Sequence, residues 1–276
     1  MRLKIKNLII NFGLLLIIIE TLTPIYFMIK YSISDRDSII TGGDVIPLWP
    51  YHPTFMVYKY LLSSPKFIDV FLNSVKVAGF TLLFALMLGV PMAYGLSKIK
   101  SVYRDFLLVF LMSIRVFPDI VSVIPITEFF IKLNLDNTIL GVSLAHTLLA
   151  LPYVIFILLA DFEKVPPEIE LQAYNLGASK TTTFLKIIMP MVIPSIIVSS
   201  IYIFILSWDE FIFSYFILGY GEIETLPVYL NKMLSFQPPQ NILMGVAVLL
   251  SLPVFVFVLL IQKRLLINIK EGALKE

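Results

Sequence analysis

Long apolar stretches separated by short polar connections dominate the pattern of this 276-residue chain. A bilayer core of about 30 Å requires roughly 20 apolar residues in one helix. Because an open strand edge cannot satisfy its backbone groups in lipid, each stretch of that length is predicted to be a membrane-spanning helix. The fold class is therefore an all-α, polytopic integral membrane protein with six transmembrane helices. The predicted helices are Leu8–Ile29, Phe71–Ser97, Phe106–Ile126, Ile139–Ala160, Met191–Leu218 and Ile242–Ile261.

The composition indicates a lipid environment and argues against several functions. Hydrophobic residues make up 58% of the chain and charged residues 14%, with a mean hydropathy of +0.91. Soluble domains carry about 25% charged residues. A net charge of +2 gives no strong electrostatic case for a nucleic-acid partner. The chain has no cysteine, and its two histidines, His52 and His146, lie far apart, so neither a disulfide nor a metal site is expected.

Basic residues predict the orientation in the membrane. The N-terminal segment, the connection Lys98–Arg104, the segment Asp161–Met189 and the C-terminal tail together carry roughly twice as many Lys and Arg as the opposite connections. The positive-inside rule then places both termini in the cytoplasm. The opposite connection Tyr31–Asp69 is the longest, and its Pro, Gly and aromatic residues predict turns and interfacial anchoring.

The chain shows no internal repeat, and residues 1–276 are predicted to form a single transmembrane domain. Within it, residues 1–66 form the first helix and an external loop, and 67–262 form a five-helix core. Residues 161–190 form a cytoplasmic loop inside that core, and 263–276 form a cytoplasmic tail.

The loop between the fourth and fifth apolar stretches is longer than a tight connection requires. Pro166 and Pro167 are suited to open a helix with Glu168 and Glu170 in its first turn. Gly177 then supplies a turn before a second helical run, Ser179–Met189. Two short helices joined at a glycine would form a knob on the cytoplasmic face. An amphipathic loop lying on the membrane is the alternative.

The segment Glu168–Pro194 resembles the EAA loop of permeases in binding-protein-dependent ABC importers. The match consists of Ala173, Gly177, Ala178, Phe184, Pro190 and Pro194. The segment departs from the family pattern at its head. Gln172 replaces the first alanine of the pair, Leu171 stands where the family usually has Glu, and Glu170 comes one residue early.

Further segments narrow the resemblance to the maltose-type permease subunits of carbohydrate importers. Each resembles a motif of that group, and all occur in the order of the group. They are Asn73-Ser74-Val75, Pro118–Pro125 with Leu133–Thr138, Trp208-Asp209-Glu210-Phe211, Thr225-Leu226-Pro227 and Gly272–Glu276.

The resemblance implies a type I ABC importer permease fold and a set of partners. These partners are a second permease subunit, two ATP-binding-cassette ATPase subunits, an extracytoplasmic sugar-binding protein and a sugar. The resemblance assigns coupling to the ATPase to Glu170, Ala173, Gly177, Ala178 and Ser179. It assigns a contact between the tail and the ATPase to Gly272, Ala273 and Lys275. The chain has no G-x-x-x-x-G-K-[ST] phosphate loop, so it is expected not to be an enzyme. ATP and Mg would bind the partner ATPase, and no cofactor is expected in this chain. A permease for another solute (amino acid, phosphate or polyamine) and a secondary transporter are the alternatives.

Polar side chains inside the apolar stretches are candidates for a translocation path because they are costly in lipid. Arg115 and Asp119 are spaced for pairing around Pro118, and Asp209 and Glu210 are expected in mid-helix. These four charged residues would line a translocation path, or alternatively they would be buried in contacts between packed helices. His146 is expected to be a packed helix residue. The candidate path residues are Tyr202, Ser207, Trp208, Asp209, Tyr215, Arg115 and Asp119.

Overall fold

The computed structural model describes residues 2–35, 48–50, 52–99, 101–219 and 221–273. Within these ranges the chain is helical, and its β-structure is one isolated bridge between Ser34 and Pro53. Five helices of the described residues are long and apolar enough to span a membrane, and a bent helix pair raises the number to six. The predicted all-α polytopic fold is confirmed, while the orientation of the termini stays a prediction.

The helices follow one another along the chain with short connections between most of them. In order they are α1 (Arg2–Ser32), α3 (Met56–Ser63), α4 (Pro65–Ser97), α5 (Val102–Ser113), α6 (Asp119–Lys132), α7 (Ile139–Phe162), α8 (Pro167–Asn175), α9 (Lys180–Thr183), α10 (Met189–Asp209), α11 (Ile212–Leu218), α12 (Leu226–Ser235) and α13 (Gln240–Ala273). A 3₁₀ turn (Ile114–Val116) follows α5, and a π-helical turn (Phe184–Ile188) follows α9.

The chain forms two compact units. The first comprises Met1–Asp69 and Tyr229–Phe255, and the second comprises Val70–Val228 and Val256–Glu276. The single domain over 1–276 and its four subdivisions stay predictions.

In the first unit, α3 packs against the start of α13. A Cβ added to Gly245 would lie 2.6 Å from Cγ1 of Val57, so glycine permits this close approach. The prediction of turns for Tyr31–Asp69 was incomplete, because α3 and the start of α4 occupy its second half. Val57 and Leu61 lie one helical turn apart and are both buried, which explains the helix. Residues 36–47 of this connection lie outside the described residues.

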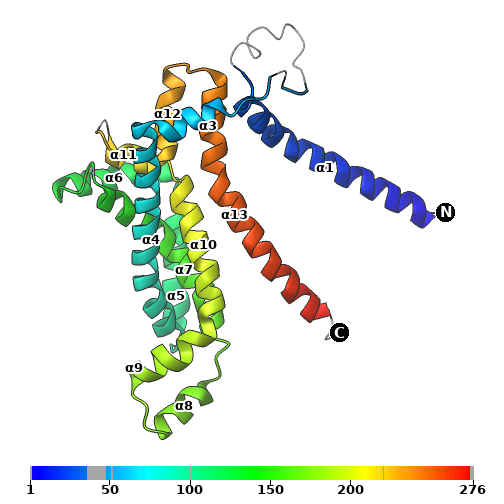
Figure 1. Ribbon diagram of the computed structural model, residues 1–276. Coiled ribbons are helices and arrows are strands. Elements are labelled where there is room, and N and C mark those ends of the chain that lie inside the picture. Colours follow the sequence, from blue (N-terminus) through cyan, green and yellow to red (C-terminus); the bar gives the residue numbers. More distant parts are fainter. Residues whose placement is uncertain (1, 36–47, 51, 100, 220, 274–276) are drawn as a thin grey trace. The chain divides into compact units, whose positions relative to one another are not determined.

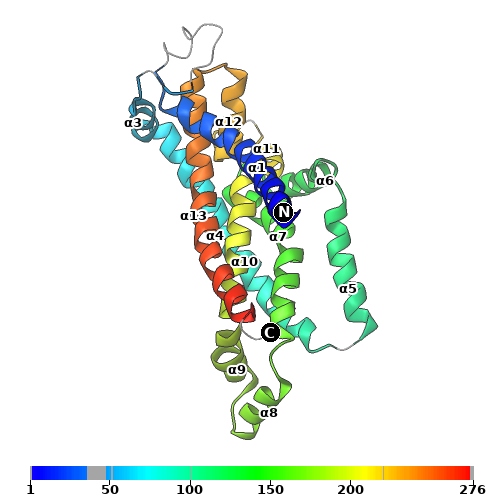
Figure 2. The same ribbon diagram turned by 90° about the vertical axis from the view of Figure 1, so that its right-hand side faces the viewer.

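In the second unit, α4, α7 and α10 run side by side, with α8 and α9 beyond one end of these helices and α6 and α11 at the other (Figure 1 and Figure 2). Small residues permit the close packing of these helices. Ala85 and Ala93 of α4 and Ala150 of α7 are buried in one apolar cluster. A Cβ on Gly89 would lie 2.7 Å from Cγ1 of Val154. This packed core positions the polar groups of the second unit.

The third predicted span is broken, so the single helix expected over Phe106–Ile126 was wrong. Helix α5 ends at Ser113, and α6 begins at Asp119 after a bend of 98°. Pro118 lacks a backbone N–H and forces Phe117 into an extended conformation (φ −69°, ψ 134°), which stops the helix.

The fifth predicted span, Met191–Leu218, is also broken. Helix α10 ends at Asp209, Glu210 is extended (φ −71°, ψ 123°), and α11 begins at Ile212. Asp209 and Glu210 therefore lie at a helix break and not in mid-helix as predicted. At its other end α10 continues from the π-helical turn, in which the Met189 N–H donates to the Phe184 carbonyl. The turn precedes Pro190, which cannot continue the regular α-helical ladder.

Candidate functional site

The loop between α7 and α10 forms two short helices that meet at Gly177, as predicted. Gly177 has a φ of +85°. Its N–H donates to the Tyr174 carbonyl at 2.9 Å, and the Ala178 N–H donates to the Ala173 carbonyl at 3.0 Å. These two bonds form a Schellman motif, which ends α8 and requires the left-handed conformation that glycine adopts without strain. The second helical run predicted over Ser179–Met189 is observed as α9 and the π-helical turn, which continue into α10.

The predicted coupling residues of this loop differ in their exposure to solvent. Ala173 is buried, Ala178 is half-buried, and Gly177 and Ser179 are exposed. Ser179 caps α9, since its Oγ accepts from the Thr182 N–H at 3.2 Å. The remaining coupling residue, Glu170, forms an ion pair with Lys98, and its side chain is only 13% exposed. The carboxylate of Glu170 therefore faces its own chain.

Arg115 and Asp119 pair as predicted, although across a helix break and not along one helix. Nη1 of Arg115 donates to Oδ1 of Asp119 at 2.9 Å. The guanidinium carbon lies 5.7 Å from the centroid of the Tyr153 ring, and the Tyr153 and Tyr202 centroids are 5.3 Å apart. Nε of Arg115 is buried without a hydrogen-bond partner. The break thus gathers an ion pair, two aromatic rings and a spare donor, with Tyr153 as the member that sequence reasoning missed.

Glu210 holds the second break. Its Oε1 accepts from the Phe213 N–H at 2.7 Å and its Oε2 from the Ser214 N–H at 3.0 Å, so the carboxylate caps the first turn of α11. Oε2 also lies 2.8 Å from Nε2 of His146, whose side chain is 0% exposed. An ionised carboxylate only accepts hydrogen bonds, so we assign a hydrogen to this Nε2. The expectation that His146 is packed is confirmed.

The contacts of His146 extend into a polar network across three helices. Nδ1 of His146 lies 2.8 Å from Oγ of Ser207, which lies 3.2 Å from Oγ1 of Thr81. Thr81 in turn donates to the Ser143 carbonyl at 3.3 Å. Thr81 and Ser143 were missed by sequence reasoning. The signal was present, since Ser143, His146 and Thr147 have the i, i+3, i+4 spacing of one helix face.

The other predicted path residues lie around this network. Trp208 is buried and packs its ring against Phe71 and Phe204 at centroid distances of 5.7 and 5.5 Å. Asp209 is exposed, and Tyr215 is half-buried beside Phe211. Of the seven predicted path residues, Arg115, Asp119 and Tyr202 therefore gather around Tyr153, and Ser207 belongs to the network of His146. Trp208 and Tyr215 pack against aromatic rings and Asp209 is exposed, so the seven do not form one continuous line.

The predicted tail contact lies at the limit of the structure. Gly272 and Ala273 end α13, their side-chain environment lies outside the described residues, and so does Lys275. No group of three or more His, Asp or Glu residues suited to a metal is present in the described ranges.

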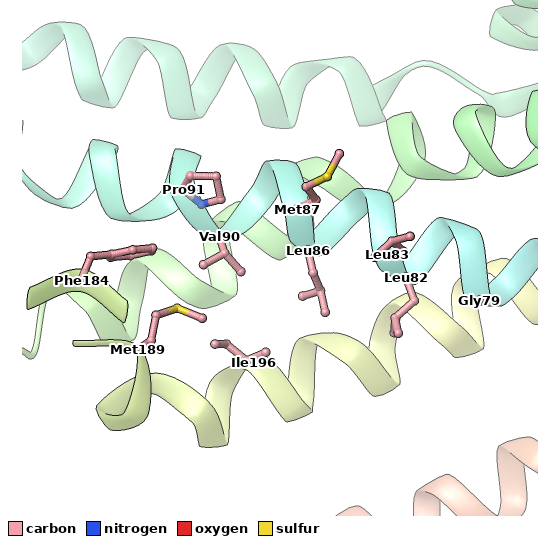
Figure 3. A pocket seen from close by; sticks show the side chains of 10 residues that line it. All are labelled: Gly79, Leu82, Leu83, Leu86, Met87, Val90, Pro91, Phe184, Met189 and Ile196. Carbon is pink, nitrogen blue, oxygen red and sulfur yellow. The ribbon is translucent and has the colours of Figure 1, made fainter. Parts of the chain in front are cut away.

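An apolar groove of about 690 Å³ lies between α4 and the start of α10. Figure 3 shows Leu82, Leu86 and Val90 of α4 directed toward Met189 and Ile196. None of the ten lining side chains carries a group able to hydrogen-bond strongly. The groove therefore lacks the polar groups that orient a sugar.

Together the fold and these sites define a class, a polytopic helical membrane protein with a structured loop beyond one end of its helices and buried polar groups within them. Residues 85–268 match the family described as binding-protein-dependent transport system inner membrane component, and the chain belongs to this family.

Two relatives match the chain over nearly its whole length. The trehalose transport system permease protein SugB of Mycobacterium tuberculosis is 26% identical over 263 residues, covering 94% of each chain. The trehalose/maltose transport system permease protein MalG of Thermococcus litoralis is 28% identical over 275 residues, covering 98% of each. A solved bacterial ABC transporter for import of the acidic polysaccharide alginate shares the fold. Its TM-score is 0.79 at 20% identity, with 94% of this chain and 96% of that chain covered.

Proposed function

We propose that this chain is a permease subunit of an ABC importer for a carbohydrate. It forms the translocation path with a second permease subunit, receives the sugar from an extracytoplasmic binding protein, and is driven by two ATPase subunits. The observation that supports this most is the loop α8–Gly177–α9, a structured knob beyond the ends of α4, α7 and α10, in a chain of the binding-protein-dependent family. The names of the trehalose and trehalose/maltose relatives support a sugar.

In this proposal the chain catalyses no reaction, and ATP and Mg bind the ATPase subunits. The loop couples their closure to the spanning helices through Glu170, Ala173, Gly177, Ala178 and Ser179. The tail residues Gly272, Ala273 and Lys275 add a second ATPase contact. The predicted cytoplasmic location of the loop and tail is part of the proposal.

The break between α5 and α6 is the part of the proposed path best suited to a sugar. Sugar sites combine aromatic faces with a few directed polar groups. Tyr153 and Tyr202 supply rings, and the partly exposed side chains of Asp119 and Arg115 supply an acceptor and a donor. Because Asp119 balances the charge of Arg115, the group as a whole is neutral and suits a neutral saccharide.

A permease for another solute remains the nearest alternative. A secondary transporter is the more distant one, and one observation favours it. Such proteins place ion sites at broken helices, and the buried His146–Glu210 pair lies at the break between α10 and α11. The two mechanisms differ in their energy source, so uptake that survives ATP depletion but is abolished by a protonophore would favour the secondary transporter.

The test of the proposed function is transport by the complete importer in lipid vesicles, with trehalose and maltose as probes. ATP-dependent uptake of at least one is expected. Gly177→Val is expected to leave the helices inserted but reduce uptake at least tenfold, because valine is strained at a φ of +85°. Asn175→Ala, a neighbouring exposed position at the end of α8, is the matched control for loop expression. Normal uptake and ATPase co-purification with Gly177→Val would contradict the coupling role of this loop.

A further inference from the structure

We propose that the Lys98–Glu170 ion pair is an internal strut that transmits movement of α8 to the end of α4. Glu170 then acts as a positioning residue within the permease, and not as a side chain that binds the ATPase. The inference rests on the proposed function, because it assumes that a partner moves the loop. Four features of the described residues carry it.

The first feature is the weak attachment of α8. Ala173 is the one residue that α8 buries among those described, and Ile169 adds a partly buried contact to the apolar core. A cavity of about 540 Å³ is lined by α8 and by residues of α4, α5 and α7 near the ends of those helices. A helix that borders such a cavity is poorly coupled to its neighbours by packing alone, because coupling by contact requires close-packed side chains.

The second feature is the direction of Glu170. Its carboxylate pairs with the ammonium of Lys98 and is largely shielded from solvent. Both residues line the cavity, so the ion pair links α8 to the residue that follows α4. The Arg104–Glu163 pair, with Nη1 and Oε1 2.5 Å apart, lines the same cavity but does not involve α8.

The third feature is the anchorage of Lys98. Its Nζ lies 4.8 Å from the centroid of the Tyr94 ring, one turn earlier on α4. Tyr94 packs against Phe162 at the end of α7, with centroids 5.5 Å apart, and against Phe184 of the π-helical turn at 4.6 Å. The end of α4 is therefore held to the elements on both sides of the loop. A force on Glu170 reaches a junction of three helices through Lys98.

The fourth feature is the surface that α8 leaves to a partner. Leu176 is 89% exposed, Leu171 is also exposed, and a Cβ added to Gly177 would meet no atom within 4 Å. A partner that docks on this surface meets apolar side chains and open backbone. The acidic group nearest to them in sequence is directed inward.

Charge reversal tests the strut in the complete importer. Lys98→Glu and Glu170→Lys each place like charges together, and each is expected to lower substrate-stimulated ATP hydrolysis about two- to fivefold, the range that a partly exposed ion pair supports. The double variant restores opposite charges and is expected to recover most of the loss, short of the part due to the Tyr94 contact. Lys164→Glu is the matched control, because the Lys164–Asp161 ion pair joins positions three residues apart at the end of α7 and does not reach α8.

The same variants separate the strut from a direct ATPase contact. Co-purification of the ATPase is expected to be unchanged in all of them. Loss of co-purification with Glu170→Lys but not with Lys98→Glu would overturn the strut, as would a double variant no better than the worse single one. A wild-type complex without stimulated hydrolysis would instead count against the proposed function.

A distance measurement gives a readout independent of activity. The chain has no cysteine, so spin labels at Ile99→Cys and at Asn175→Cys, an exposed position of α8, report on the end of α4 and the end of α8. The strut predicts one narrow distance distribution that is the same with and without ATP and vanadate. It also predicts a broader distribution in Lys98→Glu. Equal widths in wild type and Lys98→Glu would overturn the proposal.

Discussion

The two helix breaks of the second unit are made in different ways and leave different surroundings. Between α5 and α6 the break is caused by the backbone restrictions of Pro118, and the polar side chains beside it remain partly exposed. The side chains of Arg115 and Asp119 are 18% and 32% exposed. Between α10 and α11 there is no proline, and the break is held by side chains around Glu210 that are buried and mutually bonded. A break caused by proline requires no side-chain hydrogen bonds, so the neighbouring polar side chains can bind a ligand. A break stabilised by a carboxylate uses the hydrogen bonds of the side chains around it.

This difference assigns different roles to the two breaks. The first keeps an ion pair whose side chains are partly exposed, and it suits a passing ligand. The second has its histidine and carboxylate satisfied within the chain and suits a fixed structural connection between α7 and α11. Substitutions at the first are expected to affect transport more than stability, and substitutions at the second the reverse.

Glu210→Ala is expected to have the largest effect. It removes the cap of α11 and leaves the Nε2–H of His146 buried without its acceptor, which costs about 3 kcal/mol for a hydrogen bond to a charged group. Thermal unfolding of the purified complex in nanodiscs measures this. Asp209→Asn, at the exposed neighbour, is the control and is expected to change stability by less than about 0.5 kcal/mol. Equal losses of thermal stability in Glu210→Ala and Asp209→Asn would contradict the structural role assigned to the break between α10 and α11.

Arg115→Gln is expected to lower ATP-dependent sugar uptake about tenfold, the size of a lost hydrogen bond to a charged group. Thermal stability is expected to change less than in Glu210→Ala, because the Arg115–Asp119 pair is partly exposed whereas the side chain of His146 is fully buried. Uptake in vesicles and thermal unfolding are measured on the same preparation. Arg104→Gln breaks the ion pairs with Asp105 and Glu163 at the opposite end of α5 and serves as the control for loss of an arginine. A loss of stability without a specific loss of uptake would make this break structural too.

Ser207→Ala is expected to have the smallest effect. It removes one neutral partner of His146 Nδ1 and of Thr81, at a cost of about 1 kcal/mol of stability, with uptake kept. The same unfolding assay measures it, with Ser200→Ala as control, since Ser200 bonds within its own helix. Abolished uptake with unchanged stability would place Ser207 on the path and sharpen the candidate site.

The elements that sequence predicted well are those whose determinants are local. The fourth span was predicted to within two residues at its end, because α7 is apolar around most of its circumference and begins at a capping threonine, Thr138. Gly177 was predicted because a left-handed turn requires a residue type that is visible in the sequence. Pro118 was equally visible, but the apolar residues on both sides of it favoured one continuous helix.

The elements that sequence missed depend on distant residues. Nothing local to Glu210 breaks a helix, and the break is stabilised by His146, which is 64 positions away. The inward direction of Glu170 likewise depends on Lys98, which is 72 positions away. The roles predicted for the seven path residues and for the tail stay predictions, since contacts within one chain do not test them.

The Schellman motif at Gly177 has a consequence for the entropy of association. The N–H groups of Gly177 and Ala178 and the first turn of α9 find their hydrogen-bond partners inside the loop itself. The loop is therefore preorganised in the isolated chain, and a protein that docks on it does not have to order its backbone. Less conformational freedom is lost on binding, so a small contact surface supports a stable complex.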